Sequence, residues 1–220
     1  MLRYCGRWLC LTDSCALNDR VFVRILTYTT LFPNREMPRH GIFIAERLRH
    51  LLATGEANST IMAPVPWFPW RGQRFGSYGA FARVPGKETF EGCPILHPRY
   101  PVIPKVGMAM APLLLAVASY RAIRQTFGTL NDFDLIDSHY FYPDGVAAAL
   151  LGRWFNKPVV ITSRGSDLNL LPEFALPRKQ IRWAISKSAG LAAVSEMLGK
   201  RLVELGAPRE KIAVLRNGVD

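Results

Sequence analysis

Two short polar segments, Ser138–Asp144 and Ser163–Asp167, contain the side chains best suited to chemistry. The first carries His139, and the second contains an Arg-Gly-Ser-Asp sequence with charges of both signs. An imidazole can hydrogen-bond a ligand hydroxyl or exchange a proton with a reacting group near neutral pH. The competing interpretation of His139 is a structural loop residue. The choice depends on whether the fold brings the two segments together.

The sequence around these segments predicts alternating strands and helices. Asp134–Ser138 and Pro158–Thr162 have the apolar and β-branched residues of short strands, and Gly145–Phe155 between them is almost wholly apolar. This alternation is typical of βαβ units and a parallel sheet. In such sheets ligands bind beyond the carboxyl ends of the strands. We therefore expect both polar segments to open at one edge of the sheet.

The same periodicity extends over most of the chain. Val21–Thr30 is predicted to be a central strand, and Gly41 precedes a helix that Gly55 ends. Further strands are expected at Ser59–Ala63, Gly190–Val194 and Ile212–Leu215, and helices at Pro112–Phe127, at Arg178–Ser188 and from the N-cap Ser195 to Gly206. About six strands then form one Rossmann-like, doubly wound, mostly parallel α/β sheet over residues 21–216. Residues 1–20 lack a signal-peptide pattern and are expected to be a disordered extension.

Residues 64–104 differ from the rest of the chain. They are rich in Pro, Gly, Trp and Phe, without regular periodicity, and they carry Arg71, Arg74, Arg83 and Lys87. This composition predicts a long basic and aromatic loop, with a hairpin around Glu91–Pro98. Interleaved basic and aromatic residues suit nucleic acid bases or a lipid headgroup interface. A packed surface excursion without a ligand is the remaining interpretation.

The charge balance favours an anionic partner. The chain has 28 Lys and Arg against 17 Asp and Glu, a net charge of +11. Nucleic acid, a phospholipid surface and a phosphorylated substrate all fit such an excess. One alternative function is therefore a non-catalytic Rossmann-like module that binds nucleic acid or another polyanion. A degenerate, inactive remnant of an enzyme is another.

The cysteines and the most apolar run exclude two classes of protein. Cys5, Cys10 and Cys15 crowd one end while Cys93 stands alone, which fits neither zinc spacing nor a disulfide framework, so we expect a reduced, cytoplasmic protein without a metal. The uncharged run Val106–Tyr120 is shorter than the roughly 20 residues that span a bilayer. It is interpreted as a buried or membrane-touching helix that starts near Pro112.

Four segments resemble one enzyme family. TTLFPNREMPRHGIFIAERLRHL, DLIDSHYFYPDGVAAALLG, KPVVITSRGSDLN and GLAAVSEMLGKRLVELGAPREKIAVLRNGVD resemble the amino-terminal domain of the retaining glycosyltransferase family 4, of GT-B fold. The resemblance extends from Val21 to Asp220. It implies that residues 217–220 begin an interdomain linker and that a carboxyl-terminal nucleotide-sugar domain is the missing partner.

The resemblance also implies roles for individual residues. His139 matches the histidine that faces the transferred sugar and is the candidate catalytic residue. Gly41 matches a glycine that approaches the donor phosphates, where Arg39 could supply charge beside a helix N-terminus. Tyr140, Arg164 and Asp167 are the candidate acceptor-binding residues, and Arg164 replaces the histidine that is frequent in this family.

The implied activity is sugar transfer with retained configuration. The donor would be a nucleotide-diphosphate sugar, used without a cofactor or a required metal, and the acceptor a polysaccharide or a lipid-linked sugar. The chain alone is expected to be inactive. It would lie in the cytoplasm or peripherally on the cytoplasmic face of the inner membrane, held by an anionic leaflet, and nucleic acid is the less favoured partner.

Overall fold

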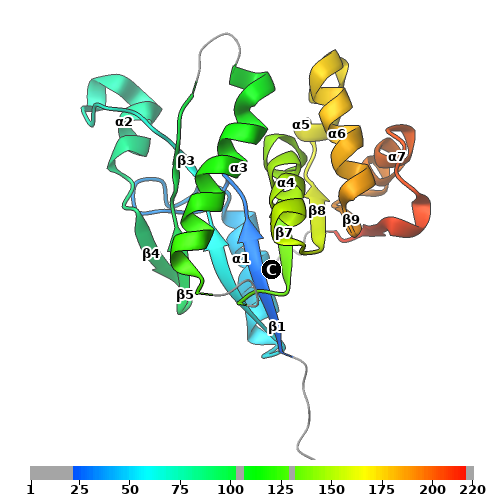
Figure 1. Cartoon of the computed structure of the whole chain (residues 1–220), viewed down its shortest axis with the longest axis horizontal. Coiled ribbons are helices and arrows are strands. Elements are labelled where there is room, and N and C mark those ends of the chain that lie inside the picture. Colours follow the sequence, from blue (N-terminus) through cyan, green and yellow to red (C-terminus); the bar gives the residue numbers. More distant parts are fainter. Residues whose placement is uncertain (1–21, 103–106, 129–131, 217–220) are drawn as a thin grey trace, which may run out of the picture.

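The computed structural model describes residues 22–102, 107–128 and 132–216. Its centre is an eight-stranded sheet in the order β10-β9-β8-β7-β1-β2-β5-β4 (Figure 1). The strands are β1 Val23–Tyr28, β2 Ala57–Met62, β4 Lys87–Phe90, β5 Cys93–Leu96, β7 Leu135–His139, β8 Val159–Ser163, β9 Gly190–Ala193 and β10 Ile212–Val214. Every neighbouring pair is parallel except β4 with β5. The predicted doubly wound α/β fold is confirmed.

Helices cover the sheet as two layers. Helices α3 Gly107–Thr126, α4 Val146–Phe155, α6 Ala175–Lys187 and α7 Glu196–Glu204 all contribute to one hydrophobic cluster that includes Leu26 and Tyr28 of β1. Helix α1, Ile42–Ala53, packs through Ile44, Ala45 and Leu48 into a second cluster with Ile61 of β2. Figure 1 shows α3, α4 and α6 in front of the sheet and α1 behind it.

Several helix ends follow the predicted signals. The Ser195 hydroxyl caps α7 by accepting a hydrogen bond from the Leu198 amide at 3.3 Å. Gly55 follows α1 with a φ of +70°, a left-handed conformation that glycine adopts without strain. Helix α3 differs from the prediction because it starts at Gly107, so Pro112 lies inside it. Proline cannot donate to the Met108 carbonyl, and that oxygen accepts a hydrogen bond from the Tyr142 hydroxyl instead.

The long-loop prediction for residues 64–104 is wrong in one respect, because most of this region is regular structure. It contains β3 Val65–Pro66, the short 3₁₀ turn Gln73–Phe75, α2 Gly76–Arg83, β4, β5 and β6 Arg99–Tyr100. The expected hairpin exists as β4 and β5, which turn at Glu91 and Gly92 with positive φ. These elements are too short for periodicity to reveal them, and β5 is fixed by pairing with distant β2.

Some expectations concern residues outside the described ranges. The amino-terminal extension 1–20 with Cys5, Cys10 and Cys15, and the linker 217–220, stay predictions. Cys93 is a buried free thiol. Among the described residues, no cluster of His, Cys, Asp or Glu could hold a metal ion. No helix in the described ranges is long and apolar enough to cross a membrane.

Candidate functional site

The carboxyl ends of β1, β7 and β8 meet at one edge of the sheet. His139 is the last residue of β7 and lies opposite Thr162 of β8, while Tyr28 of β1 lies opposite Ser138. The two polar segments therefore leave the sheet side by side, as the sequence predicts. Arg164 begins the segment after β8 and reaches back to His139.

His139 lies between a carboxylate and a guanidinium. Its Nε2 lies 3.3 Å from Asp137 Oδ2, and its Nδ1 lies 3.2 Å from Arg164 Nη2. Because a guanidinium only donates, Nδ1 is the acceptor and the ring proton lies on Nε2, toward Asp137. His139 is only 2% exposed in this arrangement. Movement of Arg164 would free Nδ1 to accept a hydrogen bond from a ligand.

Most of the charged side chains around His139 are basic. Burial disfavours the charged form of Asp137, but its interaction with His139 and the positive charges of Arg47 and Arg164 hold the pKa of this carboxyl below its ordinary value. Burial, reinforced by repulsion from Arg47, lowers the pKa of Arg164 to about 10. The Arg164 guanidinium also lies 4.8 Å from the ring centre of Phe43, in the first turn of α1. These contacts link β7, α1 and the segment after β8. The ionised carboxylate of Asp137 carries the negative charge among them.

Asp167 shapes the loops at this edge. Its carboxylate accepts hydrogen bonds from the amides of Phe141 and Gly165, both at 2.7 Å, and from the amide of Arg164 at 3.2 Å. It is fully buried. Burial raises its pKa, although these amides favour the charged form. Asp167 therefore ties the segment after β8 to the segment after β7.

Tyr140 connects the same two segments at the surface. Its hydroxyl lies 2.8 Å from Ser166 Oγ, at a site open to solvent. Tyr140 also has a positive φ of 78°, which is uncommon for a residue with a side chain. Tyr140 and Arg164 therefore present polar groups near His139, whereas the Asp167 carboxylate points inward. The acceptor-binding role of the three residues stays a prediction.

Asp144, the last residue of the polar segment Ser138–Asp144, is part of the edge, although it was not among the candidate site residues. Its Oδ2 accepts from the Thr30 amide at 2.7 Å, and the Thr30 hydroxyl lies 3.0 Å from either oxygen. Burial raises the pKa of Asp144 to about 7, against these hydrogen bonds. Its position between Pro143 and Gly145, at the end of the polar segment that follows β7, was the available signal. Asp144 joins the segment after β7 to the segment after β1.

Gly41 has two structural requirements besides its predicted role. Its φ is +66°, and a Cβ built on it would lie 2.2 Å from the Leu31 carbonyl oxygen. Only glycine fits this turn, which leads directly into the N-terminus of α1. Arg39 is exposed nearby, and His40 Nε2 lies 3.2 Å from the Thr30 carbonyl oxygen. The phosphate role of Gly41 and Arg39 stays a prediction.

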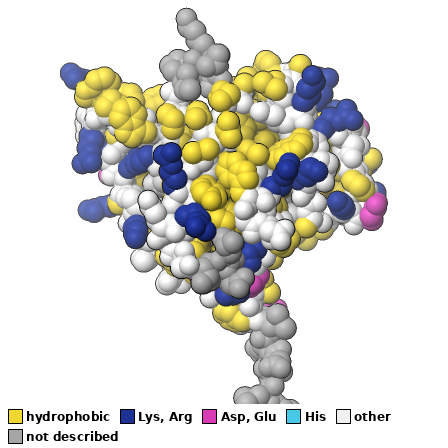
Figure 2. All heavy atoms as spheres, in the orientation of Figure 1, with side chains coloured by type: hydrophobic (Ala, Val, Ile, Leu, Met, Phe, Trp, Pro, Cys, Tyr) yellow, Lys and Arg dark blue, Asp and Glu magenta, His cyan; other side chains and the backbone are white. Residues whose placement is uncertain are grey.

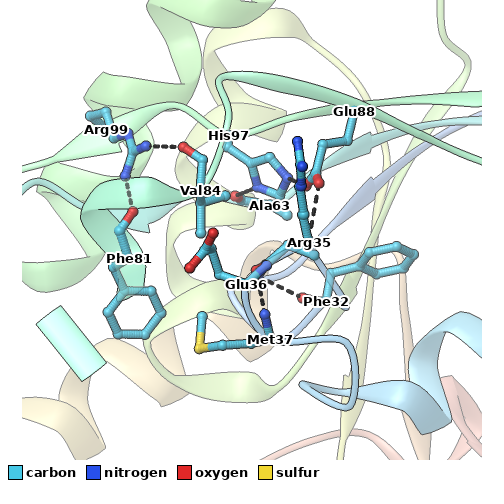
Figure 3. A network of polar contacts seen from close by, with 11 residues as sticks. Phe32, Arg35, Glu36, Met37, Ala63, Phe81, Val84, Glu88, His97 and Arg99 are labelled. Atoms are coloured by element: carbon cyan, nitrogen blue, oxygen red, sulfur yellow. Dashed lines mark hydrogen bonds and ion pairs between the residues drawn. The ribbon is translucent and has the colours of Figure 1, made fainter. Parts of the chain in front are cut away.

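A polar network supports the loop between β1 and α1 from the side of the β4–β5 hairpin and α2 (Figure 3). The Arg35 amide donates to Glu88 Oε1 at 3.0 Å, and Glu88 Oε2 lies 2.8 Å from His97 Nε2. The other His97 nitrogen lies 2.8 Å from the Ala63 carbonyl oxygen, and Glu36 pairs with Arg83 at 2.6 Å. His97 is buried and has partners on both nitrogens. The hairpin and α2 thus fix the loop that precedes Gly41.

The sheet and the position of its polar edge define the class of protein. This is a Rossmann-like domain of the kind found in GT-B enzymes, since it aligns with UDP-GlcNAc 2-epimerases. For the enzyme from Neisseria meningitidis, solved with UDP-GlcNAc bound, the TM-score is 0.52 at 15% identity, over 89% of this chain and 47% of that one. For the enzyme from Methanocaldococcus jannaschii the TM-score is 0.50 at 12% identity, over 89% and 45%.

Sequence comparison identifies the family. Residues 79–220 match Glycosyltransferase Family 4, which is more than half of the chain. The chain therefore belongs to this family. A relative is TuaC of Bacillus subtilis (strain 168), whose name assigns it provisionally to teichuronic acid biosynthesis as a glycosyltransferase. The two are 27% identical over 189 residues, 83% of this chain and 47% of TuaC.

A second relative covers a shorter part. It is the uncharacterized glycosyltransferase MJ1178 of Methanocaldococcus jannaschii, 32% identical over 87 residues, which are 40% of this chain and 24% of that protein. The chain spans about half the length of TuaC. The activity of a whole enzyme is therefore a matter of proposal for this chain.

Proposed function

We propose that this chain is the acceptor-binding, amino-terminal half of a retaining glycosyltransferase. It would act with a carboxyl-terminal domain that binds a nucleotide-diphosphate sugar, and it would be inactive alone. The observation that carries the proposal is the Asp137–His139–Arg164 arrangement, with Asp137 and His139 buried, at the carboxyl edge of a Glycosyltransferase Family 4 domain. This edge is where parallel α/β sheets bind ligands.

His139 is proposed to contact the transferred sugar. In the reaction the bond from the sugar to the donor phosphate breaks and the nucleoside diphosphate leaves with the bonding electrons, a bond to an acceptor oxygen forms, and the acceptor hydroxyl proton passes to the departing diphosphate. With its ring proton directed to Asp137, His139 can accept a hydrogen bond at Nδ1 once Arg164 moves. After such a movement the Arg164 guanidinium can contact an anionic or hydroxyl-bearing group of the acceptor.

The other residues have proposed positions around this group. Gly41 and Arg39, at the N-terminus of α1, would approach the donor phosphates. Tyr140 would contact the acceptor from the surface of the same edge. Asp167 would keep its proposed place in the acceptor site mainly by fixing the two loops, because its carboxylate already accepts three backbone amides.

The acceptor is proposed to be a polysaccharide or a lipid-linked sugar. Trp67 and Trp70 are exposed beside Arg71 and Arg74, and the rings of Trp70 and Phe75 stack at 5.5 Å. An aromatic and basic surface of this kind suits stacking against sugar rings. A lipid-linked acceptor would place the protein in the cytoplasm or peripherally on the cytoplasmic face of the inner membrane.

The proposal is tested by adding a carboxyl-terminal domain. The chain is co-expressed with the carboxyl-terminal domain of a family relative, and sugar transfer or hydrolysis is measured with UDP-glucose, UDP-N-acetylglucosamine and GDP-mannose. His139→Ala is expected to lower the rate by roughly 10²- to 10⁴-fold. His50→Ala, which changes an exposed histidine of α1, is the matched control and should keep the rate.

Two results would contradict this function. Equal rates for the two alanine variants would remove His139 from the site. Absence of turnover with every donor, together with salt-dependent binding of DNA or RNA by the chain, would favour the polyanion-binding module instead.

A further inference from the structure

A hydrophobic strip runs along the outer side of α3. Met110, Leu113, Val117 and Tyr120 follow one another at spacings of three and four residues, so they share one side of the helix. Each has 37–41% of its surface exposed. The opposite side of the helix carries buried Leu115, which packs toward the sheet. Packing of α3 into the core therefore does not account for the exposed hydrophobic strip.

The strip continues onto two neighbouring helices. A hollow of about 470 Å³ between α3 and α4 is lined by Val117, Tyr120, Arg121 and Trp154. The Trp154 ring is exposed and meets Tyr120 edge to face at 5.7 Å. A second hollow, of about 240 Å³, is lined by Pro112, Leu113, Val146, Leu150, Lys179, Gln180 and Trp183 of α3, α4 and α6. We call this surface the α3–α4–α6 face.

The charges on these helices have a single sign. Helices α3, α4 and α6 contain no Asp or Glu, whereas they carry Arg121, Arg124, Arg153, Arg178, Lys179, Arg182 and Lys187. Figure 2 shows hydrophobic side chains in the middle of this face with Lys and Arg around them, and Asp or Glu only at its margin. An apolar centre inside a basic rim is complementary to the headgroups and acyl chains of an anionic bilayer.

We propose that the α3–α4–α6 face docks on an anionic phospholipid bilayer. The proposal deepens the peripheral membrane contact proposed above by assigning it to one face of the domain. A second copy of the chain is a poorer occupant, because it would place the same basic helices against one another. Leu113 and Val117 enter the outer acyl region, Tyr120 and Trp154 lie at the interface, and the arginines contact lipid phosphates.

This orientation leaves the sheet edge accessible. The helices of the α3–α4–α6 face run alongside the strands, whereas His139 and Arg164 lie where β7 and β8 end. A bilayer bound to this face therefore does not cover the carboxyl ends of β7 and β8, where the site lies. A membrane-borne acceptor would reach the site past the first turns of α3, where Met108 and Met110 are exposed.

The test is flotation of the whole chain with vesicles. Vesicles of phosphatidylcholine alone are compared with vesicles that contain about one third phosphatidylglycerol. The double variant Leu113→Glu with Val117→Glu should bind the anionic vesicles at least about tenfold more weakly, because two anions enter the apolar strip. The control is Phe22→Glu with Leu215→Glu, an equal charge change at exposed apolar residues outside the three helices, and it should bind like the parent chain.

Each other outcome would overturn the proposal. These are no binding of the parent chain to anionic vesicles, equal weakening by both double variants, or a parent dimer in sedimentation that the strip variant makes monomeric. Circular dichroism must show equal folding of the variants, which exposed positions should allow. Vesicle binding needs neither donor nor second domain, so its failure would leave the sugar-transfer test unaffected, and the reverse also holds.

Discussion

Two buried carboxyl groups near the sheet edge have pKa values shifted in opposite directions, although burial acts on both in the same sense. The interaction of Asp137 with His139 and the positive charges of Arg47 and Arg164 outweigh burial and lower its pKa. Asp144 has threonine partners, and burial raises its pKa to about 7. Asp137 therefore stays charged, whereas Asp144 exchanges its proton near neutral pH. Asp137 therefore orients a histidine, whereas Asp144 makes the contact between two loops depend on pH.

The raised pKa of Asp144 predicts how stability depends on pH. Below about pH 4 the carboxyl is protonated in both folded and unfolded chains, and above about pH 7 the folded chain must hold a buried charge. Stability from this group is therefore fully present below about pH 4 and is lost as the pH rises to about 7, by roughly 4 kcal/mol.

Asp144→Asn should remove this dependence, because the amide stays neutral. We expect the difference in unfolding free energy, parent minus variant, to fall as the pH rises from about 4 to 8, measured by urea denaturation. Glu210→Gln changes an exposed acid and serves as the control. A constant difference for Asp144→Asn across that range would show that the group does not titrate there.

The residues of the site were predictable to different degrees. His139 and Arg164 were found because each follows a recognisable strand, and parallel strands end at a common edge. Asp144 was missed because its partner Thr30 is 114 residues away, and no local pattern reveals that pairing. The inward direction of Asp167 was equally hidden, since it follows from hydrogen bonds to a neighbouring loop.

At the scale of elements, α4 lies unusually close to β8. A Cβ on Gly145 would lie 2.6 Å from Ile161 Cγ2, and one on Gly152 would lie 2.3 Å from Val159 Cγ2. The alanines of this helix are buried between these glycines. The small residues let the helix approach the strand, and this approach positions the segment that contains Tyr140 and Asp144.

Gly152→Ala should therefore destabilise the domain, although alanine favours helix formation. The added methyl group presses on Val159 and on the Lys157 carbonyl oxygen, so we expect a loss of roughly 1–3 kcal/mol in unfolding free energy. Urea denaturation provides the measurement. Gly86→Ala, where a Cβ meets nothing within 4 Å, is the control. A Gly152→Ala domain as stable as this control would mean that α4 can shift without cost.

The elements themselves were largely predictable where they are long or clearly bounded. The strand–helix–strand unit from β7 to β8 and the Ser195 cap were predicted because apolar runs and capping residues mark them locally. The β4–β5 hairpin was predicted only approximately, and β5 as a sheet strand was missed. Its four residues contain Pro94, and they pair with β2, so tertiary contacts rather than propensity fix the strand.

At the scale of the whole molecule, charge and apolar surface are distributed unevenly. The net charge of +11 could reflect a uniformly basic surface. Instead, three adjacent helices without acidic residues surround the exposed strip on α3. A basic rim attracts anionic lipid over about a Debye length, and the apolar centre then holds the domain in one orientation. The domain would thus meet a bilayer with one face.

Tryptophan fluorescence tests this orientation directly. In a variant that keeps Trp154 as its only tryptophan, anionic vesicles should shift the emission to shorter wavelength, and brominated acyl chains should quench it, because Trp154 enters the interface. Raising the salt from about 0.1 M to 1 M should weaken the effect, since the Debye length falls from about 10 Å to 3 Å. In the control the single tryptophan is at residue 22 instead, introduced by Phe22→Trp at the amino-terminal end of β1. Its emission should be quenched little. Stronger quenching at residue 22 than at Trp154 would mean that another face meets the bilayer.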